Sequence, residues 1–188
     1  MKVAVIGGGP AGFFSAVSCG LHHAGSGIVI YEKSQKLLAK VKVSGGGRCN
    51  VTHACFNISE LSGYYPRGGK QLKRAFNHFN TIDTVKWFEK RGVKLKTEPD
   101  NRMFPVTDNS QTIVDCLVEE AKKADITVQL NSAVSGIKKV NGKFHITFKD
   151  RPDEIADKVI VTTGGSPKPE GFDWLAKLGH HIEPPVPS

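Results

Sequence analysis

The N-terminal stretch Lys2-Val3-Ala4-Val5-Ile6-Gly7-Gly8-Gly9-Pro10-Ala11-Gly12 decides the fold of this chain. An apolar strand runs directly into a Gly-x-Gly-x-x-Gly turn, and a helical segment follows the turn. A second apolar strand, Ile28-Val29-Ile30-Tyr31, ends on the acid Glu32, which lies 20 positions after Gly12. Strand, glycine turn, helix and terminal acid in this order form the βαβ fingerprint of dinucleotide-binding domains.

Each residue type in the fingerprint has a separate physical task. Gly7 allows a sharp turn, Gly9 allows backbone amides to approach a pyrophosphate, and Gly12 allows the helix to pack closely on the strand. The start of the helix offers unpaired N–H groups and the positive end of its dipole to phosphates. A carboxylate at Glu32 is placed to accept hydrogen bonds from both ribose hydroxyls. The nucleotide contacts predicted here are Gly7, Gly8, Gly9, Pro10, Ala11, Gly12, Glu32 and Lys33.

Composition and cysteine usage indicate the compartment. No apolar run approaches the roughly 18–20 residues of a membrane-spanning helix, and the first residues lack the apolar stretch and cleavage site of a secretory signal. Cys19, Cys49, Cys55 and Cys116 are scattered without a Cys-x-x-Cys pair, which is typical of reduced thiols. We therefore expect a cytoplasmic protein without a membrane partner.

The charge of the chain admits one further class of function. With 26 Lys and Arg against 18 Asp and Glu, the net charge is +8, which would suit nucleic-acid binding. The cations lie in short clusters, over 36–42 and 67–74, which we interpret as solvated faces that in part face an anionic cofactor. A nucleic-acid partner is therefore disfavoured. Cys19, His22 and His23 have helical spacing but offer no fourth ligand, so no metal is predicted, and spacing assigns no catalytic residue.

Hydrophobic periodicity divides the remaining chain into elements. An irregular, glycine-containing segment is expected over 35–65. Helices are expected over 70–79, 82–91, 110–124 and 171–178, and strands over 93–97, 126–130, 134–140, 143–149 and 157–165. The segment 102–106 is expected to be a short strand or a turn. Asn141-Gly142 marks a hairpin between two of these strands. The segment 126–130 would be a third parallel strand and 157–165 would return beside the first, joined by a three-stranded meander, which is typical of FAD-type Rossmann domains.

A second motif, Val43-Ser44-Gly45-Gly46-Gly47-Arg48-Cys49-Asn50-Val51-Thr52, follows the βαβ unit. With the glycine turn and Tyr31-Glu32-Lys33, it resembles the HI0933-like flavoproteins, bacterial FAD-dependent oxidoreductases, over the whole chain. The resemblance implies FAD as cofactor and an α/β fold, a Rossmann-like FAD-binding domain of the glutathione-reductase type with a parallel sheet and a β-meander crossover. The further FAD contacts that it implies are Ser44, Gly45, Gly46, Arg48, Cys49, Asn50, Val134, Thr163, Gly164 and Gly165.

The chemistry of the second motif agrees with this resemblance. Small residues let backbone N–H groups reach phosphate and flavin oxygens, and Arg48 can supply charge-assisted donors. Cys49 could be a redox thiol near the flavin. Because no Cys-x-x-Cys partner exists, a small residue that fills a tight loop is the favoured interpretation of Cys49.

The resemblance also implies an activity and a domain organisation. Hydride would pass between the flavin and either NAD(P)H or a small organic substrate; the alternatives are a flavoprotein that modifies tRNA and a nucleotide-binding module without catalysis. Family members are longer and close their FAD domain with a later Gly-Asp/Glu element, which does not follow Gly165 here. We therefore expect residues 1–166 to be the N-terminal part of a discontinuous FAD domain, and 167–188 to lead toward an insertion domain. The fold would then be incomplete at its C-terminus.

Overall fold

The computed structural model describes residues 1–166 and 169–184. Parts of the expected C-terminal crossover, 167–168 and 185–188, lie outside the described residues. The chain forms two compact units: a smaller unit, Lys40–Cys116, and a larger unit made of Met1–Ala39 and the described residues from Leu117 onward. The expected domain boundary after residue 166 is a different division, and it stays a prediction.

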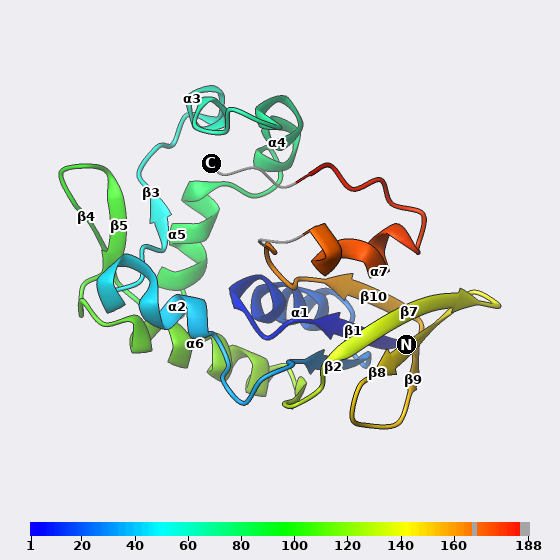
Figure 1. Ribbon diagram of the computed structural model, residues 1–188. Coiled ribbons are helices and arrows are strands. Elements are labelled where there is room, and N and C mark those ends of the chain that lie inside the picture. The colour runs from blue at the N-terminus through cyan, green and yellow to red at the C-terminus, as the bar shows by residue number, and fades with distance from the viewer. Residues whose placement is uncertain (167–168, 185–188) are drawn as a thin grey trace. The chain divides into compact units, whose positions relative to one another are not determined.

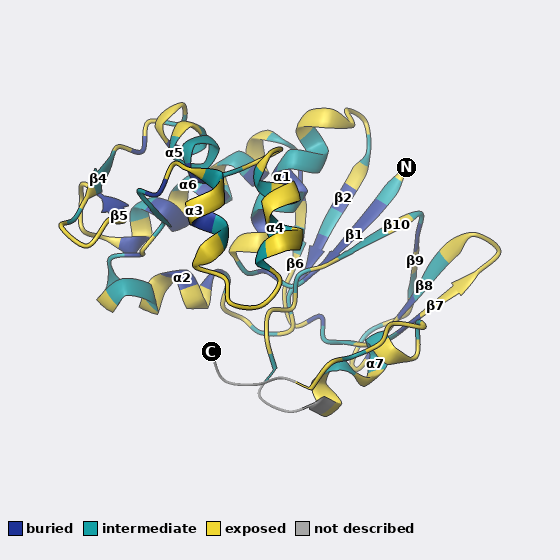
Figure 2. Ribbon diagram, turned by 90° about the horizontal axis from the view of Figure 1, so that it is seen from above, coloured by how far each residue is buried: buried dark blue, intermediate teal, exposed yellow. Residues whose placement is uncertain are grey.

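A four-stranded parallel sheet forms the centre of the larger unit (Figure 1). Its order is β10-β1-β2-β6, and its strands are β1 (Lys2–Ile6), β2 (Gly27–Tyr31), β6 (Thr127–Gln129) and β10 (Lys158–Val161). Ala4 lies opposite Val29 on one side and Val159 on the other. Most of β1 is buried (Figure 2), as is usual for a central parallel strand with both faces covered.

Helix α1 (Pro10–His22) covers one face of this sheet. Its side chains Phe13, Ala16 and Val17 are fully buried at helical spacing. Farther along the helix, a Cβ on Gly20 would lie 3.6 Å from Ile28 of β2. The helix therefore packs closely along the strands that it connects.

An antiparallel meander covers the other face. It consists of β7 (Val134–Val140), β8 (Lys143–Phe148) and β9 (Glu154–Ala156), in the order β7-β8-β9. Asn141 and Gly142 both have positive φ, as a type I′ hairpin turn requires. A buried cluster joins the meander to the sheet, and it consists of Ala4, Tyr31, Ile146, Phe148 and Ala156. After β10, the short 3-10 helix η2 (Pro169–Phe172) leads into α7 (Asp173–Ala176).

The smaller unit combines short helices with an antiparallel sheet. The strand order is β3-β5-β4, with β3 at Thr52–His53, β4 at Leu95–Thr97 and β5 at Arg102–Pro105. The helices are α2 (Ala39–Val43), η1 (Ser44–Gly47), α3 (Ile58–Gly63), α4 (Gly69–Phe76) and α5 (Thr81–Glu89). A capping box between Asn80 and Asp83 starts α5. Helix α6 (Ser110–Lys123) contains the boundary between the two units.

Most of the predicted architecture is confirmed. The parallel third strand, the meander and the return of β10 beside β1 are all present, and with them the predicted α/β class. The expectation of an irregular segment over 35–65 is wrong, because α2, η1, β3 and α3 lie within it. These elements are too short to produce a recognisable hydrophobic period. Within the described residues, no helix is long and apolar enough to cross a membrane.

Candidate nucleotide-binding site

The glycine turn after β1 is held tightly in the larger unit. Gly7 has a φ of +115°, and its N–H donates to the carbonyl oxygen of Tyr31 at 2.8 Å. A Cβ on Gly7 would lie 2.5 Å from the carbonyl oxygen of Thr162, and a Cβ on Gly12 would lie 1.9 Å from that of Gly7. Both contacts are with backbone atoms, so neither position accommodates a side chain without displacing the turn.

At position 9, by contrast, neither the backbone conformation nor the neighbouring atoms require a glycine. Its φ of −85° and ψ of −178° are open to any residue, and a Cβ there would meet no atom within 4 Å. Gly9 is the N-cap of α1, which has neither a side-chain cap nor an acid in its first turn. A helix start of this kind presents N–H groups and a positive dipole end to an anion. The open space beside Gly9 therefore fits a phosphate group.

The Glu32 carboxylate is fixed by hydrogen bonds on both oxygens. Oε2 accepts from the N–H of Gly8 at 2.8 Å, while Oε1 accepts from the N–H and the hydroxyl of Ser34, each at 2.9 Å. The carbonyl oxygen of Gly8 in turn accepts from the N–H of Leu38 at 2.9 Å. Glu32 therefore ties the middle of the glycine turn to the end of β2.

Thr162 is a part of the site that the predicted contacts omitted. Its hydroxyl lies 3.0 Å from the carbonyl oxygen of Ile6 and 3.1 Å from that of Gly7, and its N–H also donates to Ile6 at 2.9 Å. The threonine thus links the end of β10 to the turn after β1. The sequence signal for it was the pair Thr162-Thr163 at the end of a buried strand, of which the prediction kept only Thr163.

A pocket of about 230 Å³ opens where β1 and β2 end. In parallel α/β sheets, ligands bind at this carboxyl edge of the strands. The pocket brings together five of the predicted contacts: Gly7, Glu32, Lys33, Val134 and Thr163. Its other lining residues are Ile6, Tyr31, Ser132, Ala133, Lys149, Gly171 and Trp174. The remaining fingerprint residues, Gly8 to Gly12, lie in the adjoining turn and helix start, and Gly164 and Gly165 follow Thr163.

One wall of the pocket is supported by a polar cluster under Tyr31. The Tyr31 hydroxyl donates to Oε2 of Glu154 at 2.8 Å, and Glu154 also pairs with Lys2 and Arg151, each at 2.5 Å. Arg151 reaches the hydroxyl of Ser132 at 2.9 Å. Burial opposes ionisation of Glu154, but the hydrogen bonds from Lys2 and Tyr31 and the nearby cations outweigh it and lower its pKa. Burial first, and the Glu154 contact second, raise the pKa of Tyr31.

The predicted contacts Ser44 to Asn50 belong to the smaller unit, where they form a tight turn. Gly45, Gly46 and Cys49 all have positive φ. A Cβ on Gly45 would lie 2.7 Å from the ring of Phe104, whereas a Cβ on Gly46 would meet no atom within 4 Å. Gly45 is therefore explained by packing, and Gly46 leaves space for a ligand. Burial raises the pKa of the Cys49 thiol, which favours the packing interpretation of Cys49 over a reactive thiolate.

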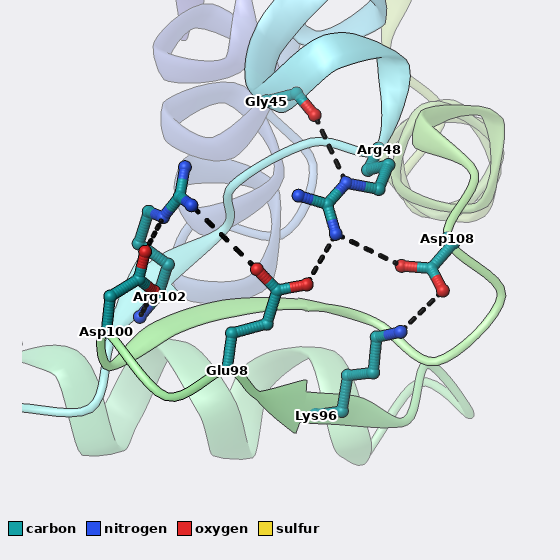
Figure 3. Close-up of polar contacts among 7 residues, drawn as sticks. All are labelled: Gly45, Arg48, Lys96, Glu98, Asp100, Arg102 and Asp108. Atoms are coloured by element: carbon teal, nitrogen blue, oxygen red, sulfur yellow. Dashed lines mark hydrogen bonds and ion pairs between the residues drawn. The ribbon is translucent and has the colours of Figure 1, made fainter.

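Arg48 is engaged by acids of the same unit (Figure 3). Its guanidinium pairs with Glu98, lies 3.7 Å from Asp108 and stacks over the Phe104 ring at 4.1 Å from the ring centroid. The contact with Glu98 is the main cause that raises the pKa of Arg48. These acidic partners balance the charge of Arg48. It could therefore bind a phosphate only through the guanidinium N–H groups that Glu98 and Asp108 do not use.

The fold and the glycine turn define a Rossmann-type dinucleotide-binding protein, and sequence comparison defines its family. Residues 1–186 match the family described as HI0933-like protein Rossmann domain. The chain belongs to this family of Rossmann domains. The predicted resemblance is thereby confirmed.

The curated relatives are about twice as long as the part that matches. Ribosomal RNA dihydrouridine synthase of Escherichia coli is 29% identical over 186 residues, covering 96% of this chain and 45% of the relative. A 3-dehydro-bile acid delta(4,6)-reductase of Clostridium scindens is 22% identical over 193 residues, covering 100% of this chain and 46% of the relative. The chain therefore spans about half the length of the curated relatives it matches.

Solved structures agree on the fold. The open conformation of a flavocytochrome c3 fumarate reductase has a TM-score of 0.63 and 20% identity, over 87% of this chain and 33% of its own. Thermovibrio ammonificans THI4 has a TM-score of 0.54 and 15% identity, over 87% of this chain and 57% of its own. At these identities the likeness concerns the fold alone.

Proposed function

We propose that this chain binds FAD and is the FAD-binding part of an oxidoreductase that exchanges hydride with NAD(P)H or a small organic substrate. The observation that carries the proposal is Gly9, which stands beside open space at an uncapped helix start. The pyrophosphate would lie against the first N–H groups of α1, and the adenosine would enter the pocket next to Glu32 and Val134.

The residues of the chain have binding and orienting tasks in this proposal. Bound flavin supplies the hydride chemistry. Glu32 keeps the turn closed through Gly8 and offers its remaining acceptor capacity to a ribose hydroxyl, while Thr162 holds the turn from β10. Gly46 leaves room for a ligand at the second motif. The bile-acid reductase among the relatives supports a small organic substrate.

The substitution Gly9→Ala tests the proposal. The added Cβ meets no protein atom and the backbone conformation suits alanine. Because alanine is a poorer N-cap residue than glycine but lowers the entropy of the unfolded chain, the melting temperature should change little. The same Cβ occupies the space proposed for the pyrophosphate, so calorimetry should show ADP and FAD affinities lower by about tenfold or more.

Gly27→Ala is the matched control for this experiment. Gly27 also has open space around its Cβ position, but it lies at the opposite, amino end of β2. This variant should bind both nucleotides as the wild type does. Equal affinities of Gly9→Ala and wild type would refute the proposed place of the pyrophosphate, and a wild-type chain that binds neither nucleotide would refute the proposed cofactor.

A second candidate function, flavin chemistry on RNA, is favoured by one segment of the smaller unit. The stretch 61–82 contains no acid but four exposed cations, Arg67, Lys70, Lys73 and Arg74. Tyr64 and Tyr65 in the same stretch are 60% and 44% exposed. Exposed cations beside exposed aromatic rings suit a single-stranded nucleic acid. The relatives named ribosomal RNA dihydrouridine synthase support the same class of partner.

This candidate is tested with a single-stranded oligouridylate probe. The double variant Lys70→Gln/Arg74→Gln should bind the probe more weakly and with a smaller dependence on salt, by about 0.7 units of slope per lost phosphate contact on a single strand. Lys36→Gln/Lys122→Gln removes the same charge elsewhere and serves as the control. Equal affinities and salt slopes of the two double variants would exclude the segment as an RNA contact.

A further inference from the structure

Helix α7 contributes an aromatic side chain to the nucleotide pocket. Trp174 and Gly171 line the same pocket as Glu32 and Val134. The indole Nε1–H donates to the carbonyl oxygen of Gly171 at 3.2 Å, which fixes one edge of the ring. The Trp174 side chain is half-buried, so part of its surface remains open to the pocket.

Tyr31, the other aromatic residue among the described lining residues, does not expose its ring to the pocket. Tyr31 is only 1% exposed, and its ring lies 4.9 Å from the Phe148 ring and 5.4 Å from the Arg151 guanidinium. Its hydroxyl is bonded to Glu154. Among the described lining residues, Trp174 therefore provides the aromatic surface that a planar base could contact.

A nucleotide placed by Glu32 needs such a surface for its base. In the proposed function, Glu32 and the start of α1 would contact ribose and phosphate, and neither would contact the base. The rest of the pocket lining includes the polar residues Lys33, Ser132, Lys149 and Thr163, the small apolar residues Ala133 and Val134, and the side chain of Trp174. Of these side chains, the indole offers a flat aromatic face, and stacking on an indole stabilises any planar base.

We propose that Trp174 is the adenine-binding residue of this site, a contact that no fingerprint glycine supplies. The proposal rests on the proposed binding of FAD and adds the residue that recognises its adenine base. It gives the segment after β10 a role in cofactor binding: α7 forms a wall of the pocket. The indole holds the base, and the hydrogen bond to Gly171 keeps the indole in place.

Tryptophan fluorescence tests the proposal directly. The chain has two tryptophans, so Trp87→Phe leaves Trp174 as the sole indole without altering the pocket. Titration of this variant with ADP should quench its emission saturably, with the dissociation constant that calorimetry gives. Inorganic pyrophosphate, which lacks a base, should bind with little change in emission. Calorimetric binding of ADP without any change in emission would overturn the role of Trp174 and leave the proposed cofactor intact.

Affinity measurements supply the second readout. Trp174→Ala should weaken ADP binding by about tenfold or more and leave pyrophosphate binding unchanged, while Trp174→Phe retains most of the affinity. Lys177→Ala, which changes an exposed residue at the end of the same helix, is the matched control and should bind ADP normally. An unchanged ADP affinity in Trp174→Ala would overturn the inference. A wild-type chain that does not bind ADP would overturn both the inference and the proposed function.

Discussion

The Glu32 carboxylate has a structural task in the glycine turn and, in the proposed function, a binding task as well. A carboxylate has about four acceptor positions on its two oxygens. Three are occupied within the protein, by the N–H of Gly8 and by the N–H and hydroxyl of Ser34. One position on Oε2 remains for a ribose hydroxyl, fewer than the two hydroxyl contacts expected from the sequence. With these three hydrogen bonds, Glu32 is not a solvated strand end without contacts.

Glu32→Gln should therefore affect both binding and stability. The amide NH₂ of glutamine would face either the Gly8 N–H or the two donors of Ser34, so at least one donor loses its acceptor. We expect an ADP affinity lower by about ten- to a hundredfold and a free energy of unfolding lower by about 1–3 kcal/mol. Calorimetry and thermal unfolding measure the two effects.

The control for this variant is Glu89→Gln, which makes the same change at an exposed helix end of the smaller unit. It should leave both quantities unchanged. An ADP affinity of Glu32→Gln equal to that of wild type would show that the carboxylate does not take part in binding.

Single residues could be predicted where the sequence itself supplies the reason. Gly7 and Gly12 belong to a local pattern, and the steric contacts at both positions agree with the pattern. The pairing of β10 with β1 was also predicted, but the contact of the Thr162 hydroxyl with the turn depends on the exact strand register and side-chain direction, which the sequence pattern does not give. Likewise, the partners of Arg48 are distant in sequence: Glu98 directly follows β4, and Asp108 lies shortly after β5. Their pairing with Arg48 could therefore not be predicted from the sequence.

At the scale of elements, the close approach of α1 to the end of β1 depends on one position. A Cβ on Gly12 would lie 1.9 Å from the carbonyl oxygen of Gly7 and 3.0 Å from the Thr162 hydroxyl, so a side chain has no room there. The helix start can therefore stand directly beside the strand end, which brings its N–H groups to the pocket edge. The long strands and helices around it were predictable because they carry several periods of pattern, whereas five-residue α2 and two-residue β3 carry almost none.

Two alanine substitutions in α1 should distinguish the steric effect of a Cβ at Gly12 from the general effect of alanine on helix propensity. Gly12→Ala should destabilise the protein by about 1–3 kcal/mol or more through overpacking against backbone, and it should also abolish ADP binding. Gly20→Ala, in the same helix, meets the Cβ of Ala124 at 3.2 Å, a mild contact offset by the better helix propensity of alanine. Its melting temperature should stay close to that of wild type. Similar melting temperatures for the two variants would contradict the close packing at Gly12.

At the scale of the larger unit, the sheet and the meander are joined by a polar cluster as well as by apolar burial. Tyr31 of β2 and Glu154 of β9 share a hydrogen bond, Lys2 of β1 pairs with the same carboxylate, and Arg151 lies 4.8 Å from the Phe148 ring centroid. The meander was predictable from the Asn141-Gly142 turn, but this cluster was not, because its members are brought together only by the packing of meander on sheet. It couples the pocket wall to the stability of the whole unit.

Because of the Tyr31 phenol, the free energy of unfolding of this unit should depend on pH in the alkaline range. Its pKa in the folded protein is raised above the ordinary value of 10.0, first by burial and then by Glu154. The folded state therefore keeps the proton above pH 10, while the unfolded chain releases it. The unfolded state binds fewer protons there, so the free energy of unfolding falls as pH rises. The contribution of Tyr31 is fully present below pH 10, and above it the loss approaches about 1.4 kcal/mol per pH unit.

Tyr31→Phe removes this one titrating group and keeps the ring. Urea unfolding between about pH 9 and pH 11.5 should show a shallower loss of stability in the variant than in wild type, by up to about 1.4 kcal/mol per pH unit above pH 10. At neutral pH the variant should be less stable, because Glu154 loses a hydrogen bond and keeps only Lys2 and Arg151. Tyr64→Phe, at a tyrosine that is 60% exposed, serves as the control and should follow the wild-type curve. Parallel curves for Tyr31→Phe and wild type across this range would mean that the phenol ionises alike in both states, and that the cluster does not hold its proton.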